Sequence, residues 1–386
     1  MQSTNNDRNT HTGPLCGVRV IELAAIGPVP FCAMLLADMG AEILRIDSPG
    51  AERGALPQEE AMLRGRCRLT LDLKDPLHQG YLREILPHAD MLLEGMRPGV
   101  LERLGIGPDR CLAINPALVI GRMTGWGQTG PLAQVPGHDP NYLAISGALH
   151  AMGYGDRPPL PPLNLVGDFG GGALYLAMGL LAALLHARAT GAGQVVDAAM
   201  LDGVSSLLSS IHAMRNLGMW SDVRGTNLMD GICPFACSYA TADDRYVMVA
   251  AIEPKFYRAL LAGLGLDEAS LPSRDDEANW PLLKERFASV FRTRTRDEWA
   301  NRLEGTDACV TPILNLGEAR DHPQIKSRGI FSEDSDLPAA APRFSHTPSR
   351  HAPKDCGGAA ACLQRWGVEG EALALAQGQA GPVKPR

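Results

Sequence analysis

Short apolar segments alternate with helical stretches along the first third of the chain. Segments rich in Val, Ile and Leu have the length and composition of buried strands, and helical patterns separate them. The predicted strands are 17–23, 41–47, 69–73, 89–95 and 117–123, with predicted helices at 31–40, 76–86 and 108–114. Such alternation predicts an α/β fold with a parallel sheet covered by helices. The right-handed crossover rule makes this sheet a Rossmann-like, doubly wound layer.

The pattern changes after residue 167. The glycine-rich stretch DFGGG (168–172) opens a long apolar helix, which ends at ATGAG (189–193). Its most apolar part, 173–185, is shorter than a bilayer-spanning helix, so we predict a buried core helix and no membrane insertion. A strand and a helix follow, and a hairpin with a helix comes next at 238–265.

The length of 386 residues predicts more than one domain. A polar linker at 221–231 separates a large Rossmann-like domain from a smaller α+β domain. The predicted boundaries are a disordered tail at 1–14, the large domain at 15–220, the small domain at 232–325, a C-terminal return to the large domain at 326–375 and a second disordered tail at 376–386.

Charge and cysteine content narrow the class of function. The net charge of −7 argues against a nucleic-acid partner. The N-terminal residues form no apolar signal segment, so we expect a cytoplasmic location. The nine cysteines are spread along the chain, and we expect them to be reduced thiols. Cys233 and Cys237 lack a second pair at zinc spacing, so no metal site is expected.

The turn after the first strand is informative through what it lacks. A dinucleotide site requires glycines there, because the backbone must approach a pyrophosphate closely. This turn is AAIGPVP (24–30), and its two prolines remove two backbone N–H groups. A nicotinamide cofactor is therefore not expected.

Polar and ionisable residues gather between 124 and 172, where His138, Asp139, Asn164 and Asp168 occur. Asp168 begins a predicted helix, and a plain N-cap is one interpretation. The three glycines that follow are poor helix formers, which favours a second interpretation. In it, they leave room for a developing negative charge to approach the N–H groups at the helix start.

His138 lies in the polar loop PGHDPNY, whereas most histidines are structural. Adjacent side chains rarely pair, so we expect Asp139 to orient another group, with Asp168 as one target through hydrogen bonds shared with Asn164. The arginines near the predicted strand ends are either solvated surface or a site for a phosphate-bearing ligand. They are Arg45, Arg64, Arg66, Arg68, Arg97 and Arg103.

Six blocks together resemble CoA-transferase family III, the CaiB/BaiF group, and within it the α-methylacyl-CoA racemases. They are the opening block at 17–47, MTGWGQTGP, GHDPNY, NLVGDFGGG, GAGQVVDAAMLDG and AIEPKFY. The resemblance extends over residues 15–349. It implies an interlocked homodimer that acts on acyl-CoA in fatty-acid metabolism. It implies no cofactor either, since CoA is part of the substrate.

The resemblance also implies roles for particular residues. His138 and Asp168 correspond to the two acid/base groups, and Glu253 to a glutamate that supports the histidine. Gly137, Asp139, Tyr142 and Asn164 are expected to support the site. The expected CoA-binding residues are Arg45, Arg64, Thr70, Leu71, Asp72, Leu73, Gly95, Met96, Arg97 and Arg103. Related racemases often carry arginine where this chain has Ser48, and an apolar residue where it has Pro140.

The mechanism expected from this resemblance is a two-base proton transfer at the α-carbon of a 2-methylacyl thioester. A neutral His138 faces one side and a protonated Asp168 the other, and the enolate oxygen is expected on N–H groups near Asp168. Transferases of the family use the corresponding aspartate as a nucleophile but have an aromatic residue in place of His138. A family III CoA-transferase and a non-catalytic acyl-CoA-binding protein are therefore the alternatives. The acyl group stays open.

Overall fold

The computed structural model describes residues 13–50, 61–331, 336–352 and 356–379. Most of the two tails predicted as disordered lies outside these residues. The chain divides into two compact units. Unit 1 takes its described residues from Met1–Ser146, Leu163–Leu207 and Phe331–Arg386, and unit 2 consists of Gly147–Pro162 and Leu208–Ile330. Residues 147–162 and 208–220, predicted in the large domain, therefore belong to unit 2.

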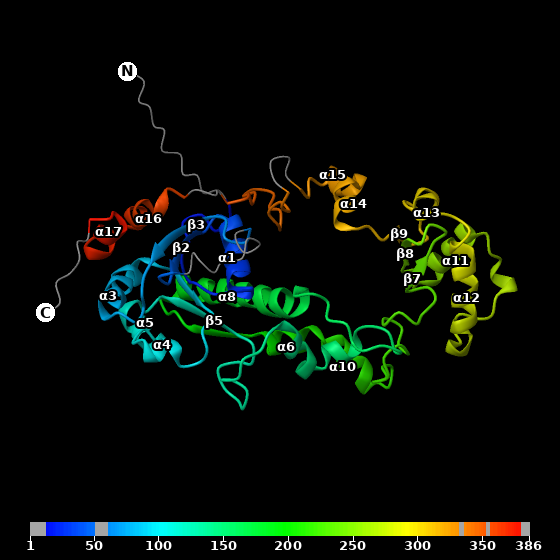
Figure 1. Ribbon diagram of the computed structural model, residues 1–386, viewed down its shortest axis with the longest axis horizontal. Helices are drawn as coiled ribbons and strands as arrows, with labels where there is room; N and C mark the ends of the chain where they lie inside the picture. The colour runs from blue at the N-terminus through cyan, green and yellow to red at the C-terminus, as the bar shows by residue number, and fades with distance from the viewer. Residues whose placement is uncertain (1–12, 51–60, 332–335, 353–355, 380–386) are drawn as a thin grey trace, which may run out of the picture. The chain divides into compact units, whose positions relative to one another are not determined.

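Unit 1 is built on six parallel strands in the order β3-β2-β1-β4-β5-β6 (Figure 1). This is the strand order of a doubly wound sheet, which confirms the predicted Rossmann-like layer. The strands are β1 (Arg19–Leu23), β2 (Glu42–Asp47), β3 (Arg66–Thr70), β4 (Met91–Glu94), β5 (Val119–Thr124) and β6 (Val195–Ala199).

The third strand begins three residues earlier than predicted. Its pairing with β2 runs from Arg66, opposite Ile43, to Thr70, opposite Asp47. Arg66 is buried because its Nε donates to Glu22 at 2.9 Å. The apolar pattern placed the start of this strand too late, because it did not allow for a buried arginine. The charge of Arg66 is compensated inside the sheet by Glu22.

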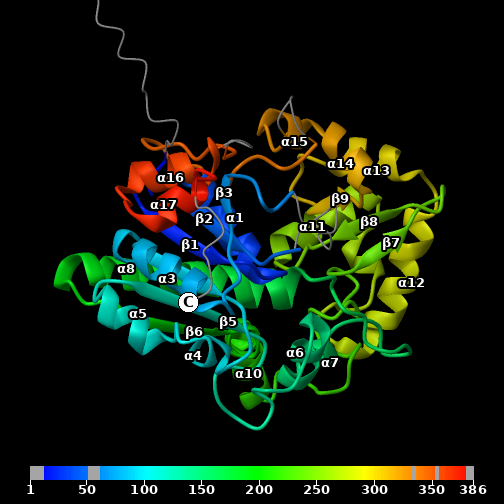
Figure 2. The ribbon, with the colours of Figure 1, turned by 60° about the vertical axis from the view of Figure 1, so that its left-hand side comes forward.

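Helices cover both faces of the sheet (Figures 1 and 2). One face packs against α1 and α8, and the other against α3, α5 and the C-terminal helices α16 and α17. The helices of unit 1 are α1 (Pro28–Asp38), α3 (Pro76–Ile85), η2 (Leu86–His88), α4 (Val100–Arg103), α5 (Pro108–Ile114), α6 (Asp139–Ser146), η3 (Leu165–Ala173), α8 (Leu174–Thr190), α9 (Met200–Leu207), α16 (Gly358–Trp366) and α17 (Glu371–Ala376).

The long apolar helix begins with a π-helix, η3, and continues as α8. Together they run over 26 residues from Leu165 to Thr190, so by length and composition this helix could cross a membrane, unlike the shorter stretch predicted. Leu176 and Leu180 of α8 pack against the position of Gly121 on β5. The helix is thus a core element of unit 1, and core helices pass the same length test.

The described residues from Phe331 onward belong to unit 1, whereas residues 326–330, predicted in this C-terminal return, belong to unit 2. Arg19 on β1 donates to the carbonyl of Trp366 at 3.1 Å, and the N–H of Ala372 donates to Glu84. Cys67 on β3 and Cys356 form a disulfide, so the prediction that all cysteines are reduced is wrong for this pair. The other seven cysteines are thiols.

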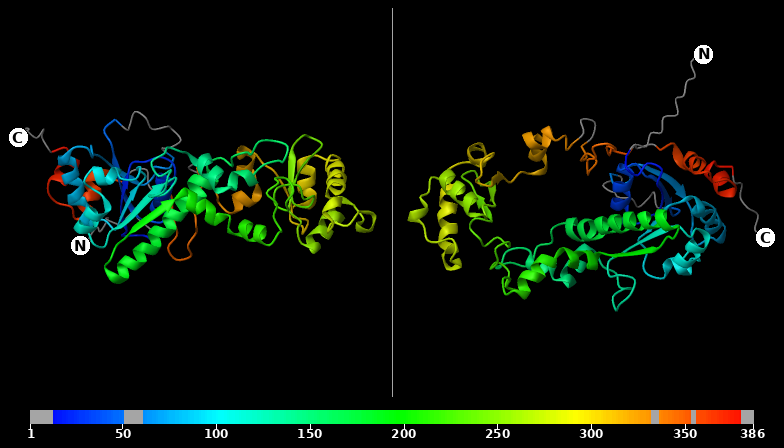
Figure 3. Two further views of the ribbon diagram at one scale, coloured as in Figure 1. Left: turned by 90° about the horizontal axis from the view of Figure 1, so that it is seen from below. Right: turned by 180° about the vertical axis from the view of Figure 1, so that it is seen from behind.

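Unit 2 contains a three-stranded antiparallel sheet, in the order β7-β8-β9, with helices packed on it (Figure 3). Its strands are β7 (Ser238–Ala240), β8 (Tyr246–Val249) and β9 (Val310–Pro312). Its helices are α7 (Ala148–Ala151), α10 (Ser209–Asn216), α11 (Pro254–Leu264), η4 (Glu268–Ser270), η5 (Glu277–Asn279), α12 (Trp280–Phe291), α13 (Arg296–Leu303), α14 (Leu316–Asp321) and α15 (Pro323–Ser327). The predicted linker is a folded segment, because the Asp230 carboxylate accepts the N–H groups of residues 225–227.

Candidate active site

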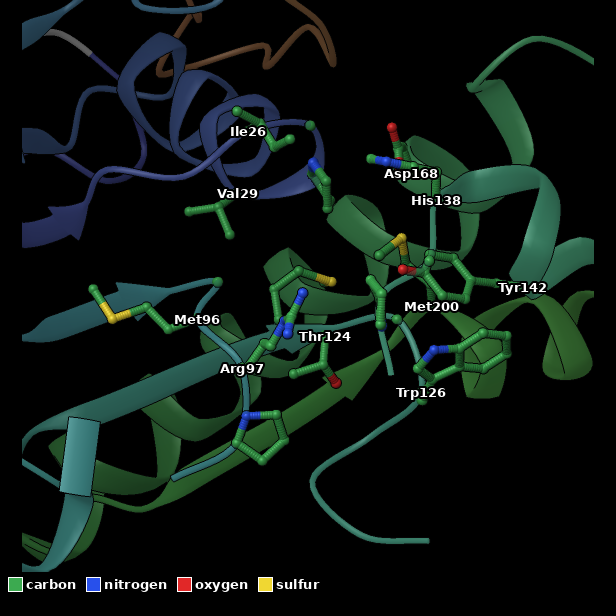
Figure 4. Close-up of a pocket in the computed structure, with 18 of the residues that line it drawn as sticks. Ile26, Val29, Met96, Arg97, Thr124, Trp126, His138, Tyr142, Asp168 and Met200 are labelled. Carbon is green, nitrogen blue, oxygen red and sulfur yellow. The ribbon is translucent and has the colours of Figure 1, made fainter. Parts of the chain in front are cut away.

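A cavity of about 600 Å³ lies in unit 1 where the turns after β1, β4 and β5 meet (Figure 4). β1 and β4 are neighbours in the sheet but not in the sequence, so this is the switch point of the strand order. Open α/β sheets bind ligands there, outside the carboxyl ends of the strands. The walls are residues 26–29, 95–98, 123–126, 133 and 135–138, with Met62, Tyr142, Asn164, Asp168 and Met200.

The turn after β1 lies directly against Asp168. Gly27 has φ 66°, and a Cβ built on it would fall 3.2 Å from Oδ2 of Asp168. Pro28 then starts α1, where its missing N–H costs nothing. The sequence AAIGPVP thus brings the backbone close to a carboxyl group.

Asp168 lies within η3 and does not cap it. The N-cap is Asn164, whose carbonyl accepts the N–H of Phe169, five residues later, at 3.3 Å. The interpretation of Asp168 as a plain N-cap is therefore wrong. π-helical turns are rare and are frequent at functional sites. This one projects Asp168 into the cavity.

The side chain of Asp139, on α6, is hydrogen-bonded to the backbone of η3. One oxygen of its carboxylate, Oδ2, accepts the backbone N–H of Asp168 at 2.7 Å. Asp139 lies in the first turn of α6 and is buried, with 4% of its surface exposed. Asp139 thus contacts one of its expected targets, Asp168, through the backbone N–H, and a role in orienting the Asp168 side chain stays a prediction.

Gly167 makes this contact possible. A Cβ on Gly167 would fall 2.3 Å from Oδ2 of Asp139 and 2.5 Å from Cγ. No side chain fits in that space.

The pKa values of the two neighbouring carboxyl groups are both raised from their ordinary values. Burial raises the pKa of Asp168, and the negative charge of Asp139 raises it further, while a hydrogen bond from Asn164 and the charge of His138 lower it to a smaller degree. Burial also raises the pKa of Asp139. The sequence left open which influence on the Asp168 pKa is larger, and in the structure burial and the charge of Asp139 together raise it.

The glycines after Asp168 serve packing. A Cβ on Gly171 would fall 2.7 Å from the backbone N of Val204, and one on Gly172 would fall 3.0 Å from Met200. Helix α9 thus occupies the room that the sequence suggested for a ligand. The N–H of Asp168 itself is already bound to Asp139 and is not free for an enolate oxygen. The expectation that N–H groups near Asp168 bind this oxygen stays a prediction.

His138 precedes α6 and lines the same cavity as Asp168. Its backbone N–H donates to Oδ1 of Asn141 at 3.0 Å, which fixes the loop while the side chain stays exposed. Tyr142, one turn further, packs edge-to-face on Trp126 with ring centroids 4.6 Å apart. A Cβ on Gly137 would fall 2.9 Å from the Tyr142 ring, so Gly137 and Tyr142 shape the loop together.

Comparison with known proteins assigns the chain to a family. Residues 15–356 match the model of CoA-transferase family III. The chain belongs to CoA-transferase family III. The α-methylacyl-CoA racemases of mouse and human are 44% and 43% identical to it, and each alignment covers 87% of both chains. The resemblance drawn from the sequence is therefore confirmed.

A solved structure of a CaiB/BaiF family protein from Brucella suis matches with a TM-score of 0.78 at 26% identity. The match covers 92% of this chain and all of that one. The α/β architecture with its parallel sheet is thus shared within the family.

The predicted CoA-binding residues fall into two groups. Gly95, Met96 and Arg97 line the cavity, and the Arg97 side chain is exposed (Figure 4). Thr70, Leu71, Asp72, Leu73 and Arg103 do not line it. Leu71 is a buried core residue, and the Arg103 guanidinium lies beside Gly99, behind the 95–99 turn.

Arg45 and Arg64 are engaged in ion pairs outside the cavity lining. Arg45 donates to Glu22 at 2.5 Å and to Asp47 at 2.9 Å, and is buried. Arg64 contacts both carboxylate oxygens of Asp38. These pairs stabilise the sheet and α1, so neither guanidinium is available in this structure to replace the arginine absent at Ser48.

Glu253 lies in unit 2 as the N-cap residue of α11, exposed, with its carbonyl accepting the N–H of Tyr257. Cys233 and Cys237 are both buried in the core of that unit. Among the described residues, no group of three or more His, Cys, Asp or Glu side chains could hold a metal ion.

Sequence reasoning missed several residues of the cavity wall. Trp126 and Thr124 lie in the quoted block MTGWGQTGP but received no role, and Ile26, Val29 and Met200 were not singled out. It also missed the Glu94–Arg122 ion pair. A signal was present, because each is a charged residue inside an otherwise apolar strand.

Replacing Asp139 with asparagine should lower the pKa of Asp168. Asparagine can still accept the Asp168 N–H, but it removes the negative charge that raises that pKa. A carbon-13 NMR titration of the carboxyl groups, with the Asp168 signal assigned through Asp168→Asn, measures the change. The exposed Asp202 provides the matched control, since Asp202→Asn should leave the Asp168 titration in place. An unchanged or higher Asp168 pKa in Asp139→Asn would contradict the prediction.

Proposed function

We propose that this protein is an isomerase that inverts the α-carbon of 2-methyl-branched acyl-CoA thioesters. The observation that carries the proposal is the presence of His138 and a carboxyl group with a raised pKa, Asp168, in the walls of one cavity. A cavity of about 600 Å³ is in the ordinary range for a small-molecule site, and its wall is largely apolar. An acyl-thioester end fits there, and the nucleotide end of CoA extends beyond it.

The proposed reaction moves one proton off the α-carbon and another onto its opposite face. In one direction, His138 accepts the α-proton as the C–H bond breaks, and the electron pair passes into the thioester carbonyl as an enolate. Protonated Asp168 then donates its proton to the other face. In the reverse direction, ionised Asp168 accepts and protonated His138 donates. The step needs no oxidant, metal or cofactor, and CoA enters as part of the substrate.

The test is solvent exchange in D₂O with (R)- and (S)-2-methyldecanoyl-CoA. Deuterium at the α-carbon and loss of configuration from both hands support the proposal. Acyl transfer to an added carboxylic acid, without exchange, would instead make Asp168 the nucleophile of a CoA-transferase. Tight binding with neither reaction would indicate an acyl-CoA-binding protein.

We further propose a cytoplasmic homodimer in which Glu253 of one protomer supports His138 of the other. Glu253 is exposed at the start of α11 and uses no side-chain oxygen to cap that helix, so its carboxylate is available. A carboxylate against an imidazole orients the ring and stabilises its charged form. The elution volume of the protein in size-exclusion chromatography tests the dimer.

Replacing Glu253 with glutamine should lower kcat roughly 10-fold or more, since it removes part of the 10²- to 10⁴-fold that positioned acid/base groups contribute. Because the side chain is exposed, thermal unfolding should be unchanged. Glu268→Gln, an exposed glutamate in the same unit, is the matched control. Unaltered turnover in Glu253→Gln would exclude Glu253 from the site.

A further inference from the structure

A buried ion pair lies immediately beneath one wall of the cavity. Glu94, the last residue of β4, is fully buried, and its Oε1 accepts from Nε of Arg122 at 2.8 Å. The two residues are opposite each other in the pairing of β4 with β5. Arg122 also donates from Nη1 to Oε1 of Glu102 at 2.8 Å. The pair therefore links β4, β5 and α4.

The second oxygen of Glu94 is bound to the cavity wall itself. Oε2 accepts the backbone N–H of Met96 at 2.6 Å, two residues further along the chain. Met96 belongs to the 95–98 turn that lines the cavity. The other end of the turn is held as well, because Gln134 donates from its side-chain amide to the carbonyl of Pro98 at 3.1 Å.

The turn fixed in this way carries Arg97, an exposed arginine that lines the cavity (Figure 4). Arg45 and Arg64 are already paired with carboxylates outside the cavity lining. Arg97 is therefore the cation that the described cavity wall offers to the phosphates of CoA. Its direction depends on the backbone of the turn, and the turn depends on Glu94.

Besides its ion pair with Arg122, Glu94 contacts the cavity turn through the N–H of Met96. Buried charges cost desolvation free energy, and apolar residues of similar size often stabilise as well. Burial raises the pKa of Glu94, and the hydrogen bonds from Arg122 and the Met96 N–H act in the opposite direction.

We propose that Glu94 is a positioning residue for the CoA half of the substrate: held by Arg122, it fixes the 95–98 turn so that Arg97 meets the CoA phosphates. This inference rests on the proposed function, because it takes acyl-CoA as the ligand. It assigns Glu94 to substrate affinity and leaves the proton transfer to His138 and Asp168.

The test replaces Glu94 with glutamine. Arg122 and Met96 donate to different oxygens of Glu94, and glutamine replaces one of these oxygens with an NH2 group, so one of the two donors loses its acceptor and the turn relaxes. We expect KM for 2-methyldecanoyl-CoA to rise about tenfold with little change in kcat. With the N-acetylcysteamine thioester of the same acid, which lacks the nucleotide and its phosphates, KM should be the same as for the wild type.

Two further variants complete the test: Arg97→Ala probes the same contact, and Glu102→Gln is the control. Arg97→Ala should show the same selective rise in KM, and the double variant should be no worse than Arg97→Ala, because both act through one contact. Glu102→Gln removes the exposed partner of Arg122 but leaves the Glu94–Met96 contact, so its KM should stay close to that of the wild type.

An equal rise in KM for both thioesters, or strictly additive effects, would overturn the inference by showing that Glu94 only supports the fold. Unchanged KM in Glu94→Gln would overturn it as well. The Kd of free CoA, measured by calorimetry, separates this from the proposed function. If the wild type bound CoA and Glu94→Gln bound it about tenfold more weakly without any exchange reaction, the inference would stand and the racemase proposal would fall.

Discussion

Asp168→Asn should abolish racemisation while leaving α-proton exchange intact for one hand of the substrate. Asparagine is close in size to aspartate but has no transferable proton, so the face served by Asp168 loses its acid and base. We expect the racemisation rate to fall by roughly 10²- to 10⁴-fold, the contribution typical of a positioned acid/base group. His138 can still remove and return a proton on its own face, so that hand exchanges with retention of configuration.

His138→Gln is the complementary experiment, because it removes the acid/base group on the opposite face of the substrate. It should also stop racemisation, but the hand that keeps exchanging should be the opposite one. Mass spectrometry of the α-carbon in D₂O, combined with chiral analysis, measures exchange and configuration separately. Retention of exchange for the same hand in both variants would contradict the two-base assignment. The Asp168→Asn variant should keep its fold, because the contact from Asp168 to Asp139 uses the backbone N–H of Asp168 and not its side chain.

Gly167→Ala should be the most damaging substitution that touches neither acid/base side chain. Its Cβ would fall 2.3 Å from Oδ2 of Asp139, a separation that real Cβ atoms do not show. Either Asp139 leaves the Asp168 N–H or η3 shifts, and both outcomes move Asp168. Misplacement of a catalytic group by about 1 Å costs roughly 100-fold in rate. Overpacking of this kind costs about 1–3 kcal/mol of the free energy of unfolding.

Gly170→Ala is the matched control in the same π-helix. A Cβ there would fall 3.1 Å from the carbonyl oxygen of Leu165 and 3.6 Å from Leu207, so a small adjustment accommodates it. The kcat and the urea midpoint of both variants should be compared with those of the wild type. Equal activity of Gly167→Ala and Gly170→Ala would show that the Asp139 contact does not position Asp168.

The sheet could be predicted because its strands carry their signal locally. Apolar runs separated by helices correctly indicated parallel strands, and α5 begins and ends where the sequence placed it. The prediction failed at the start of β3, where Arg66 is buried. Its partner Glu22 is 44 residues away, so no local pattern shows that this charge is compensated.

The candidate site was predictable as a set of residues but not as a geometry. The density of polar groups and the family blocks pointed to His138 and Asp168. They could not show that Asp139 binds a backbone N–H 29 residues away, or that the glycines of DFGGG pack against α9. Contacts of this kind depend on which helices meet, and spacing along the chain does not encode that.

The C-terminal helices α16 and α17 have a consequence for the order in which the chain can fold during synthesis. Cys362, Leu363 and Trp366 complete a core that begins with Ile21 on β1 and Leu44 on β2. One face of the first sheet therefore keeps apolar surface uncovered until the ribosome has released nearly the whole chain. Unit 2 ends at Ile330 and can close its own core earlier. Domains usually fold in the order in which they emerge; here, the unit that begins first finishes second.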